Sequence, residues 1–237
     1  MRKDGKYGFD DKVWGDVFDR ATLMAVHKLF NKGIIEKIQG ELSSGKEAKV
    51  FLALNDEPLA VKIYRVTSSA FETIWGYLKG DPRYSNISKN RRAVIELWAR
   101  KEFSNLSRLY SAGVDVPRPY AFQNNIVVME FIGDEAGGRA PMLKHLGRPD
   151  RTPELFSRII GDVRKAYQIA KLVHADLSEY NILMKEGRPV IIDVGQAVDI
   201  KHPNAGAFLR RDIENLVKFF KAEQSVSELE RWVKKHG

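Results

Sequence analysis

The sequence predicts an α+β fold with two lobes, a strand-rich first half and a helix-rich second half. Apolar residues recur with a period of two between residues 34 and 64, which indicates antiparallel strands. A long amphipathic helix is expected at 92–112, and helical periodicity dominates after residue 150. Residues 172–198 carry a polar loop, a short apolar hairpin and the tripeptide Asp193-Val194-Gly195.

The chain is 237 residues long, which is enough for one domain or two closely joined lobes. We expect a helical extension over 1–33 that packs on the first lobe. The first lobe covers 34–132, with a flexible loop at about 66–90, and the second lobe covers 133–237.

In the first half, helices are predicted at 16–31, where Gly33 supplies the stop, at 70–78 and at 92–112. Strands are predicted at 34–42, 48–54, 59–64, 114–122 and 126–131. In the second half, Thr152-Pro153-Glu154 has the composition of a helix start and predicts a helix over 153–172. A helix at 206–220 follows, and Ser225 with Glu228 predicts a capping box before a last helix.

The composition excludes disulfide and zinc-thiolate chemistry, because the chain has no cysteine. With 39 Lys+Arg against 31 Asp+Glu, the net charge of +8 favours phosphate-rich partners but also suits an ordinary soluble protein. No apolar run is long enough to span a bilayer and no apolar leader opens the sequence, so we expect a cytoplasmic protein without a membrane partner.

The loop His174-x-Asp176-Leu-x-x-x-Asn181, followed by a hairpin and Asp193-x-Gly195, has the spacing of a kinase catalytic loop and its metal motif. Asp176 would accept the proton of an attacking hydroxyl or water. Asn181 would offer an amide oxygen to Mg²⁺, and Asp193 would supply the carboxylate that joins the metal to the phosphates. The alternative is a capped turn before an ordinary hairpin.

Two charged residues stand where apolar residues are expected. Lys62 lies inside an apolar strand, and Glu102 lies on the apolar stripe of the long helix. Each is costly to bury alone, so we predict that they pair and that Lys62 binds the α- and β-phosphates of a nucleotide. The alternative for Lys62 is an edge lysine whose amino group reaches solvent.

The hairpin at 43–50 is a candidate phosphate loop. It is not a Walker A loop, because Glu47 follows Lys46. Its small residues would let backbone N–H groups approach phosphate, and the candidate residues are Ser43, Ser44, Gly45, Lys46, Glu47 and Val50. Residues 129–132 are the candidate adenine-binding hinge, namely Met129, Glu130, Phe131 and Ile132, although Met129 and Phe131 also suit a strand core.

Ser-Ser-Gly-Lys-Glu-Ala at 43–48, His-Ala-Asp-Leu-Ser-Glu-Tyr-Asn at 174–181 and Ile-Asp-Val-Gly-Gln-Ala at 192–197 together resemble the RIO family of atypical serine/threonine protein kinases. They are more similar to its type-one branch than to type two, and the resemblance covers about residues 15 to 230. It implies a reduced two-lobed kinase fold, ATP with Mg²⁺ (for which Mn²⁺ can substitute), and an ATP-dependent kinase with ATPase activity.

The resemblance also implies roles for individual residues. Asp176 is the catalytic base, Asn181 and Asp193 hold Mg²⁺, Lys62 pairs with Glu102, and Asp193 is the residue that would become an aspartyl-phosphate. The family is linked to small ribosomal subunit maturation and to serine autophosphorylation, so the implied partners are a small-subunit precursor and its RNA. The protein substrate stays unknown.

Departures from ordinary protein kinases point toward limited phosphorylation. No Ala-Pro-Glu follows Asp193, and Ser178 stands where those kinases carry a lysine that neutralises the transferring group. The fold is therefore expected to lack an activation loop and a peptide-docking subdomain. An ATPase-driven switch on a ribosomal particle fits these absences better than rapid phosphorylation of free peptides.

Further candidates lie outside the motifs. Asp212 is expected to hydrogen-bond the catalytic-loop backbone, with a surface ion pair to Arg211 as the alternative. The basic segment Arg83–Arg108 is the candidate RNA contact, with a solvated helix face as its alternative, and Ser85 and Ser88 are candidate autophosphorylation sites. Competing functions are a small-molecule phosphotransferase, for which the second lobe is short, and a nucleotide-binding assembly factor with little catalysis.

Overall fold

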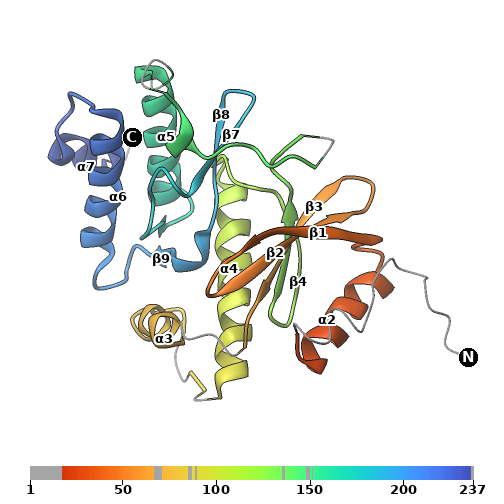
Figure 1. Cartoon of the computed structure of the whole chain (residues 1–237). Helices are drawn as coiled ribbons and strands as arrows, with labels where there is room; N and C mark the ends of the chain where they lie inside the picture. The colour runs from red at the N-terminus through yellow and green to blue at the C-terminus, as the bar shows by residue number, and fades with distance from the viewer. Residues whose placement is uncertain are drawn as a thin grey trace, which may run out of the picture. The chain divides into compact units, whose positions relative to one another are not determined.

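The computed structural model describes residues 18–66, 71–84, 87–88, 90–134, 137–147, 150 and 152–235 (Figure 1). The chain forms two compact units that interleave in sequence. The first unit comprises 1–75, 88–103 and 118–139, and the second comprises 76–87, 104–117 and 140–237. Residues 132 and 133, between which a lobe boundary was expected, both lie in the first unit. Helix α4 (Arg91–Ser111), in contrast, is divided between the two units after Phe103.

In its described part, the first unit contains one antiparallel sheet of five strands in the order β1-β2-β3-β5-β4. The strands are β1 (Lys37–Ser44), β2 (Ala48–Leu54), β3 (Pro58–Tyr64), β4 (Pro119–Gln123) and β5 (Ile126–Glu130). Val61 and Val128 face each other on β3 and β5, and both are fully buried. The sheet therefore provides the core on which the lysine of β3 is mounted.

Two expected strands begin later than the alternating pattern suggested. Gly33 has φ +65°, and the N–H of Ile34 bonds back to Leu29 at 3.0 Å, so Ile34 closes the preceding helix and β1 starts at Lys37. Gly113 does the same after α4, where the N–H of Val114 bonds to Leu109 at 3.1 Å. Residues after a helix-ending glycine thus complete the helix cap, which a period of two does not reveal.

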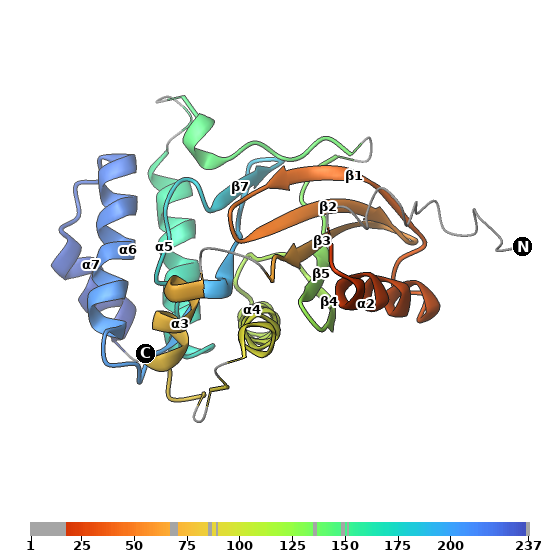
Figure 2. The ribbon, with the colours of Figure 1, turned by 60° about the horizontal axis from the view of Figure 1, so that its bottom comes forward.

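Helix α2 (Arg20–Asn31) packs against the sheet within the first unit (Figure 2). It begins at Arg20 rather than at residue 16, because Asp19 is its N-cap and accepts the N–H of Thr22 at 3.0 Å. Its apolar face, including Val26 and Leu29, joins one core with Phe51 and Ile63 of the sheet. The first 17 residues of the expected N-terminal extension lie outside the described residues.

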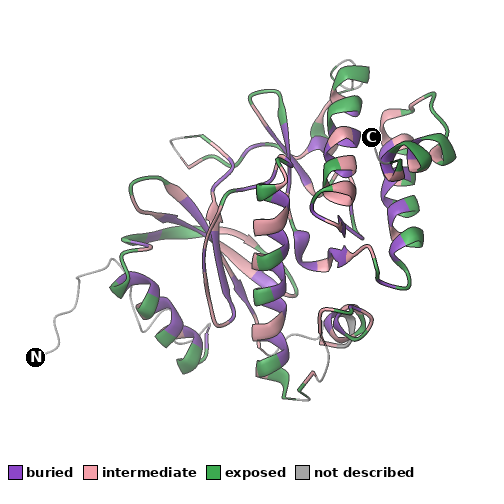
Figure 3. Ribbon diagram, turned by 180° about the vertical axis from the view of Figure 1, so that it is seen from behind, coloured by how far each residue is buried: buried purple, intermediate pink, exposed green. Residues whose placement is uncertain are grey.

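Helix α3 (Phe71–Lys79) lies within the segment expected to be a flexible loop, close to the predicted helix at 70–78. Helix α4 has the length expected from the sequence, and Figure 3 shows its buried face. Ile95, Trp98 and Leu106 are buried on that face together with Glu102. The same face also buries Lys101 and Asn105, which are unusual residues for a helix interior.

The second unit combines helices with short hairpins. Its elements are η1 (Leu143–His145), α5 (Pro153–Gln168), β6 (Leu172–Val173), β7 (Ile182–Lys185), β8 (Arg188–Ile191), η3 (Val194–Gln196), β9 (Val198–Asp199), α6 (Ala205–Phe220) and α7 (Val226–Lys234). Helix α5 ends before the predicted Leu172, because Lys171 has φ +55° and Leu172 pairs with Asp199 in the β6–β9 ladder. The predicted caps at Thr152 and Ser225 are confirmed.

Helices α5, α6 and α7 pack together beside these hairpins (Figure 1). Phe156 of α5 and Phe220 of α6 have ring centroids 5.3 Å apart. Between Gly195 and the start of α6 at Ala205, the chain forms only a 3-10 turn, β9 and a turn, so this connection is short, as expected. No described helix has the length and apolar character needed to cross a membrane.

Candidate active site

The lysine of the first unit is paired as predicted. The Nζ of Lys62 lies 2.7 Å from Oε1 of Glu102, and the side chains are 12 % and 2 % exposed. Strand β3 carries the lysine, and α4 delivers the glutamate from 40 residues further along the chain. This buried ion pair excludes the alternative of a solvated edge lysine, since the amino group has its counter-charge inside the protein.

Tyr64 completes this pair, although it is not among the residues predicted from the sequence. Its hydroxyl donates to Oε2 of Glu102, so each carboxylate oxygen has a partner. The Nζ of Lys62 also lies 5.1 Å from the centre of the Tyr64 ring. Tyr64 follows Lys62 by two residues on the same strand, so the two side chains share a face of the sheet. This two-residue spacing along the strand was the sequence signal that could have identified Tyr64.

The hairpin at 43–50 is a tight turn between two paired strands. Ser43 pairs with Val50, and the N–H of Gly45 bonds to the carbonyl of Ala48 at 2.9 Å. Lys46 is exposed at the tip and Glu47 is half-buried. The guanidinium of Arg65 donates to the hydroxyl of Ser44 at 2.9 Å. The short turn presents exposed backbone and a basic side chain, which suits a phosphate-binding hairpin.

The candidate hinge follows β5. Met129 and Glu130 are half-buried, whereas Phe131 and Ile132 are buried. The N–H of Glu130 bonds to the carbonyl of Arg118 at 2.8 Å, and that of Phe131 to Pro58 at 3.3 Å. Both donors are therefore occupied within the sheet, and hydrogen bonding to an adenine is left to other backbone groups of this segment.

In the second unit, the loop between β6 and β7 brings together the predicted catalytic residues. The Nδ2 of Asn181 donates to the backbone carbonyl of Asp176 at 2.8 Å and lies 3.4 Å from its Oδ2. The amide nitrogen is thus committed to the loop. This orientation leaves the amide oxygen as the end that a metal ion can take.

Asp193 is held beside the same loop. The backbone N–H of Ile192 donates to the carbonyl of Asn181 at 2.9 Å, and Nε2 of His174 lies 3.1 Å from the carbonyl of Ile192. Asp193 itself is exposed and left-handed, with φ 59° and ψ 58°. A residue other than glycine adopts this conformation at a cost of about 1–2 kcal/mol. Such a cost is typical of functional turns.

The carboxyl group of Asp176 responds to these surroundings. Partial burial raises the pKa of Asp176, the nearby charge of His174 opposes this, and the like charge of Asp193 raises the pKa further. Hydrogen bonds tie both carboxylate-bearing segments to Asn181, whose amide donates to the carbonyl of Asp176 and whose backbone carbonyl accepts the N–H of Ile192. Carboxylate and amide oxygens are the ligands that Mg²⁺ prefers, so the residues present fit Mg²⁺, which Asn181 and Asp193 would hold.

Among the described residues, no cluster of three or more His, Asp or Glu side chains could hold a metal ion on its own. This is compatible with Mg²⁺ bound to a nucleotide, because such an ion takes only one or two carboxylates from the protein and fills its shell with phosphate and water.

Asp212 of α6 bonds to the backbone of the loop between β6 and β7. Its Oδ2 accepts the N–H of Ala175 at 2.8 Å, and its Oδ1 accepts that of Leu177 at 2.9 Å. The residue is 1 % exposed, and burial raises its pKa to about 6. The hydrogen bonds predicted between Asp212 and the loop backbone are therefore present, and the buried carboxylate does not form a surface ion pair with Arg211. Arg211 donates instead to the carbonyl of Ala175.

The basic segment Arg83–Arg108 is less available than its sequence suggested. Arg83 and Arg108 bond to protein groups, Arg92 pairs with Asp19 at 2.8 Å, and Lys101 is fully buried. Arg91 and Arg100 are exposed. Ser88 is exposed, as a modification site requires, whereas Ser85 lies outside the described residues.

A family model matches this chain. The model describes the RIO domain and covers residues 49–231, which include Lys62, Glu102, Asp176, Asn181 and Asp193.

Curated relatives agree with the family match. The RIO-type serine/threonine-protein kinase Rio1 of Haloferax volcanii is 44 % identical over 214 residues, which are 90 % of this chain and 73 % of that protein. Rio1 of Methanocaldococcus jannaschii is 39 % identical over 226 residues, covering 94 % and 77 %. Human RIO1 is 40 % identical over 209 residues, covering 86 % of this chain but only 37 % of that protein.

A solved structure shows the same fold. The Rio2 kinase from Chaetomium thermophilum superposes with a TM-score of 0.71 at 23 % identity, covering 92 % of this chain and 69 % of that chain. A second structure of that kinase, as an ADP/Mg²⁺-phosphoaspartate complex, gives 0.70 at 22 % identity, covering 92 % and 67 %. The fold is therefore α+β and protein-kinase-like, and the chain belongs to the RIO family of serine/threonine protein kinases, with its similarity to proteins named Rio1 supporting the type-one branch.

Proposed function

We propose that this chain binds ATP with Mg²⁺ and transfers the γ-phosphoryl group to serine or to water. The observation that carries the proposal is the cluster of Asp176, Asn181 and Asp193 around one short loop. Asp176 takes the proton of the attacking hydroxyl, while Asn181 and Asp193 hold the metal. When bound, Mg²⁺ supplies positive charge that neutralises the charge developing on the phosphates.

Residues of the first unit bind the nucleotide in this proposal. Lys62 contacts the α- and β-phosphates and is held in place by Glu102, its partner at 2.7 Å. The hairpin at 43–50 approaches the phosphates with its backbone, and the segment 129–132 receives the adenine. Lys62 is pre-oriented by two neighbours, Glu102 and Tyr64, so little ordering remains to be done when ATP binds.

The acceptor is a serine of the protein itself or water, rather than a free peptide. Two features support this choice. Ser178 supplies no positive charge for the transferring group, and the short connection between η3 and α6 has no room for an activation loop. Asp193 is the carboxylate that would form a phosphoaspartate, the species present in the Chaetomium thermophilum Rio2 complex. Exposed Ser88 is the described candidate for autophosphorylation.

The direct test incubates the protein with γ-labelled ATP and Mg²⁺ and asks where the label ends. We expect label in free phosphate and on serine, with an acid-stable linkage. Label that hydroxylamine removes would show an acyl phosphate, for which Asp193 is the proposed carrier. Asp176→Asn should abolish turnover, whereas Asp56→Asn at an exposed turn is the matched control. Undiminished hydrolysis in Asp176→Asn would contradict the proposal.

We further propose that ATP turnover times the release of the protein from a small ribosomal subunit precursor in the cytoplasm. The net charge of +8 and the exposed Arg91 and Arg100 favour an RNA surface. Binding to precursor RNA is measured against salt concentration, and the Arg91→Gln/Arg100→Gln double variant should flatten the salt dependence. Affinity that does not weaken as salt rises would remove the case for RNA.

A further inference from the structure

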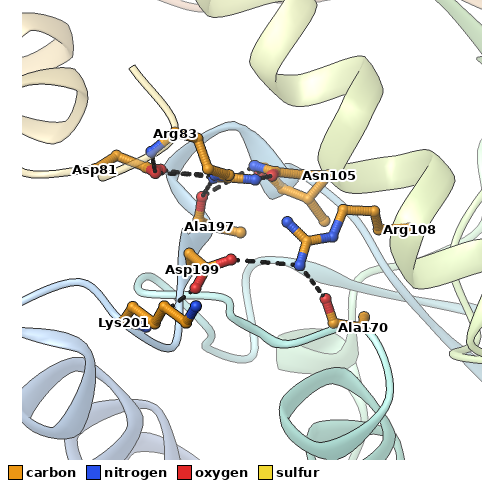
Figure 4. A network of polar contacts seen from close by, with 9 residues as sticks. Asp81, Arg83, Asn105, Arg108, Ala170, Ala197, Asp199 and Lys201 are labelled. Atoms are coloured by element: carbon orange, nitrogen blue, oxygen red, sulfur yellow. Dashed lines mark hydrogen bonds and ion pairs between the residues drawn. The ribbon is translucent and has the colours of Figure 1, made fainter. Parts of the chain in front are cut away.

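The turn that follows Asp193 is held by a buried side chain outside the recognised motifs. Asn105 lies on α4 and is fully buried. Its Nδ2 donates to the carbonyl of Val194 at 2.9 Å. It also donates to the carbonyl of Ala197 at 3.0 Å, and Figure 4 shows Asn105 and Ala197 with Arg83. These two carbonyls are at the beginning and just after the end of η3, and the N–H of Ala197 closes the turn onto Val194 at 3.1 Å.

The other end of the Asn105 amide is fixed by Arg83. The Nη1 of Arg83 donates to Oδ1 of Asn105 at 2.7 Å, and its Nη2 reaches the carbonyl of Ala197 at 3.2 Å. Both polar atoms of a buried amide therefore have partners, which sets the orientation of Asn105. Arg83 acts on the turn directly and through Asn105.

Arg83 is itself held by Asp81, whose side chain is fully buried. The guanidinium grips the carboxylate with two bonds, Nε to Oδ1 at 2.9 Å and Nη2 to Oδ2 at 2.6 Å. Burial lowers the pKa of Arg83, but the hydrogen bond and charge of Asp81 outweigh it and raise that pKa above its ordinary value. The planar fork allows one arginine to serve Asp81, Asn105 and Ala197 together, which a lysine cannot do.

The segment before Arg83 packs closely against His202. Gly80 lies against the ring of His202, where an added Cβ would come within 2.3 Å of Nε2. His202 is buried, and its Nδ1 accepts the N–H of Asn204 at 3.0 Å, so the ring is not free to move away. The packing of Gly80 against His202 and the ion pair of Asp81 therefore hold Arg83 in place within the second unit.

We propose that Asn105, locked by Arg83 and Asp81, positions the Asp193 carboxylate for the divalent cation. The inference rests on the proposed function, because it deepens the role of the same metal site. Neither Asn105 nor Arg83 touches the metal; both are positioning residues. The left-handed backbone of Asp193 is unfavourable, and the residues on both sides of it are held: His174 and Asn181 bond to Ile192, and Asn105 bonds to Val194.

The test measures metal binding apart from turnover. The variants are Asn105→Ala, Arg83→Met and Arg83→Lys, and Arg210→Met is the matched control, because Arg210 is an exposed arginine paired with Glu214 on α6. Mn²⁺ affinity is measured by electron paramagnetic resonance in the presence of a non-hydrolysable ATP analogue. Affinity for ATP in EDTA and the Mg²⁺ concentration for half-maximal turnover are measured in parallel.

We expect Mn²⁺ affinity to fall roughly tenfold in Asn105→Ala and Arg83→Met, as it does when partners of metal ligands are removed elsewhere. Metal-free ATP affinity should stay within about twofold in the same variants. Arg83→Lys keeps the charge beside Asp81 and should stay folded, yet it should lose most of the same metal affinity because it lacks the fork.

Unchanged Mn²⁺ affinity in Arg83→Lys and the other variants, relative to Arg210→Met, would overturn the inference. An equal loss of metal-free ATP affinity would also overturn it, since the effect would then be general loosening of the fold. If the parent protein shows no Mg²⁺-dependent turnover but the variants still lose Mn²⁺ affinity, the proposed function fails and the positioning role stands.

Discussion

Asp212 and Ala175 form the contact that fixes the catalytic loop, because Oδ2 of Asp212 accepts the N–H of Ala175 at 2.8 Å within a fully buried setting. Ala175 is left-handed, with φ 67°, and its carbonyl accepts from Arg211. Both polar groups of a strained residue are thus held by α6. These bonds fix the backbone immediately before Asp176, and Asn181 holds the carbonyl of Asp176 itself.

Removing the Asp212 carboxylate should destabilise the protein and stop turnover. Asp212→Ala leaves the N–H groups of Ala175 and Leu177 without their acceptors, at a cost of about 1–3 kcal/mol each, partly offset because a buried charge is also removed. We expect the free energy of unfolding in urea to fall by about 2 kcal/mol or more. Glu214→Ala, an exposed acid on the same helix, should cost under about 1 kcal/mol. Equal effects of the two substitutions would argue against the support role.

The pH dependence of stability gives a second test of Asp212. Its pKa is about 6 in the folded chain, raised by burial against the opposing charges of His174 and Arg211, and 3.8 is its ordinary value. The folded state therefore holds this proton more tightly, so the contribution of Asp212 is favourable at low pH and is lost as pH rises through about 6.

Between pH 5 and 7, wild type should lose on the order of 1 kcal/mol relative to Asp212→Asn, which cannot ionise. Urea unfolding of both proteins at the two pH values measures this difference. A difference of opposite sign would show that ionised Asp212 is stabilised in the folded chain, contrary to the raised pKa.

The acid limit of activity should report on Asp176. A general base works only when ionised, so activity is lost as pH falls through its pKa, which lies above the ordinary value because of burial, with His174 and Arg211 opposing and Asp193 adding to the shift. Arg211→Met removes a nearby positive charge and should move the acid limb of kcat/KM to higher pH. Arg210→Met should leave the limb in place. A shift to lower pH in Arg211→Met would exclude this electrostatic relation.

The pairing of Lys62 with Glu102 could be predicted because each is a charged residue at an apolar position of a regular pattern. A charged residue that becomes buried needs an opposite charge or hydrogen-bond partners in any fold. The hydrogen bonds of Asp212 were expected on other grounds, from the buried acid that larger kinases carry at this place. The Arg83–Asn105 clamp could not be predicted in the same way. Asn105 bonds to the carbonyl of Val194, which lies 89 residues further along the chain, and no local sequence pattern predicts a contact over that separation. Asn105 does stand three residues after Glu102 on a buried helix face, which marks it as polar and inward without naming its partner.

The predicted starts of β1 and β4 differ from the structure for a related reason. The alternation of apolar side chains predicts where a strand can lie, but it carries no information on the backbone hydrogen bonds that end α2 and α4. Those bonds use the residues that were expected to open the two strands. The Ser43–Val50 hairpin and the 129–132 segment occupy the expected positions in the sheet. Whether they contact nucleotide remains a prediction.

The Lys62–Glu102 pair should couple stability to catalysis. Glu102→Gln keeps the shape but leaves the ammonium of Lys62 without its counter-charge in a site where the glutamate is 2 % exposed. We expect the free energy of unfolding to fall by about 1–3 kcal/mol and kcat/KM for ATP to fall roughly tenfold or more. Glu96→Gln, a half-buried acid on the same helix that accepts from Asn124 at 3.1 Å, is the control and should leave kcat/KM within about twofold.

The left-handed Ala175 predicts an unusual response to glycine. Glycine adopts φ 67° without penalty, so Ala175→Gly relieves about 1 kcal/mol of backbone strain in the folded protein. The same substitution lowers the free energy of the unfolded chain by about as much, because glycine has greater conformational freedom there. The free energy of unfolding should therefore change by less than about 0.5 kcal/mol. The same substitution at Ala25, inside α2, should cost about 1 kcal/mol. Ala175→Val should cost more than either, because a β-branched side chain disfavours this conformation and the site is fully buried. If Ala175→Gly costs as much as Ala25→Gly, the loop does not hold Ala175 in the left-handed conformation in solution, and the support of Asp176 must come from elsewhere.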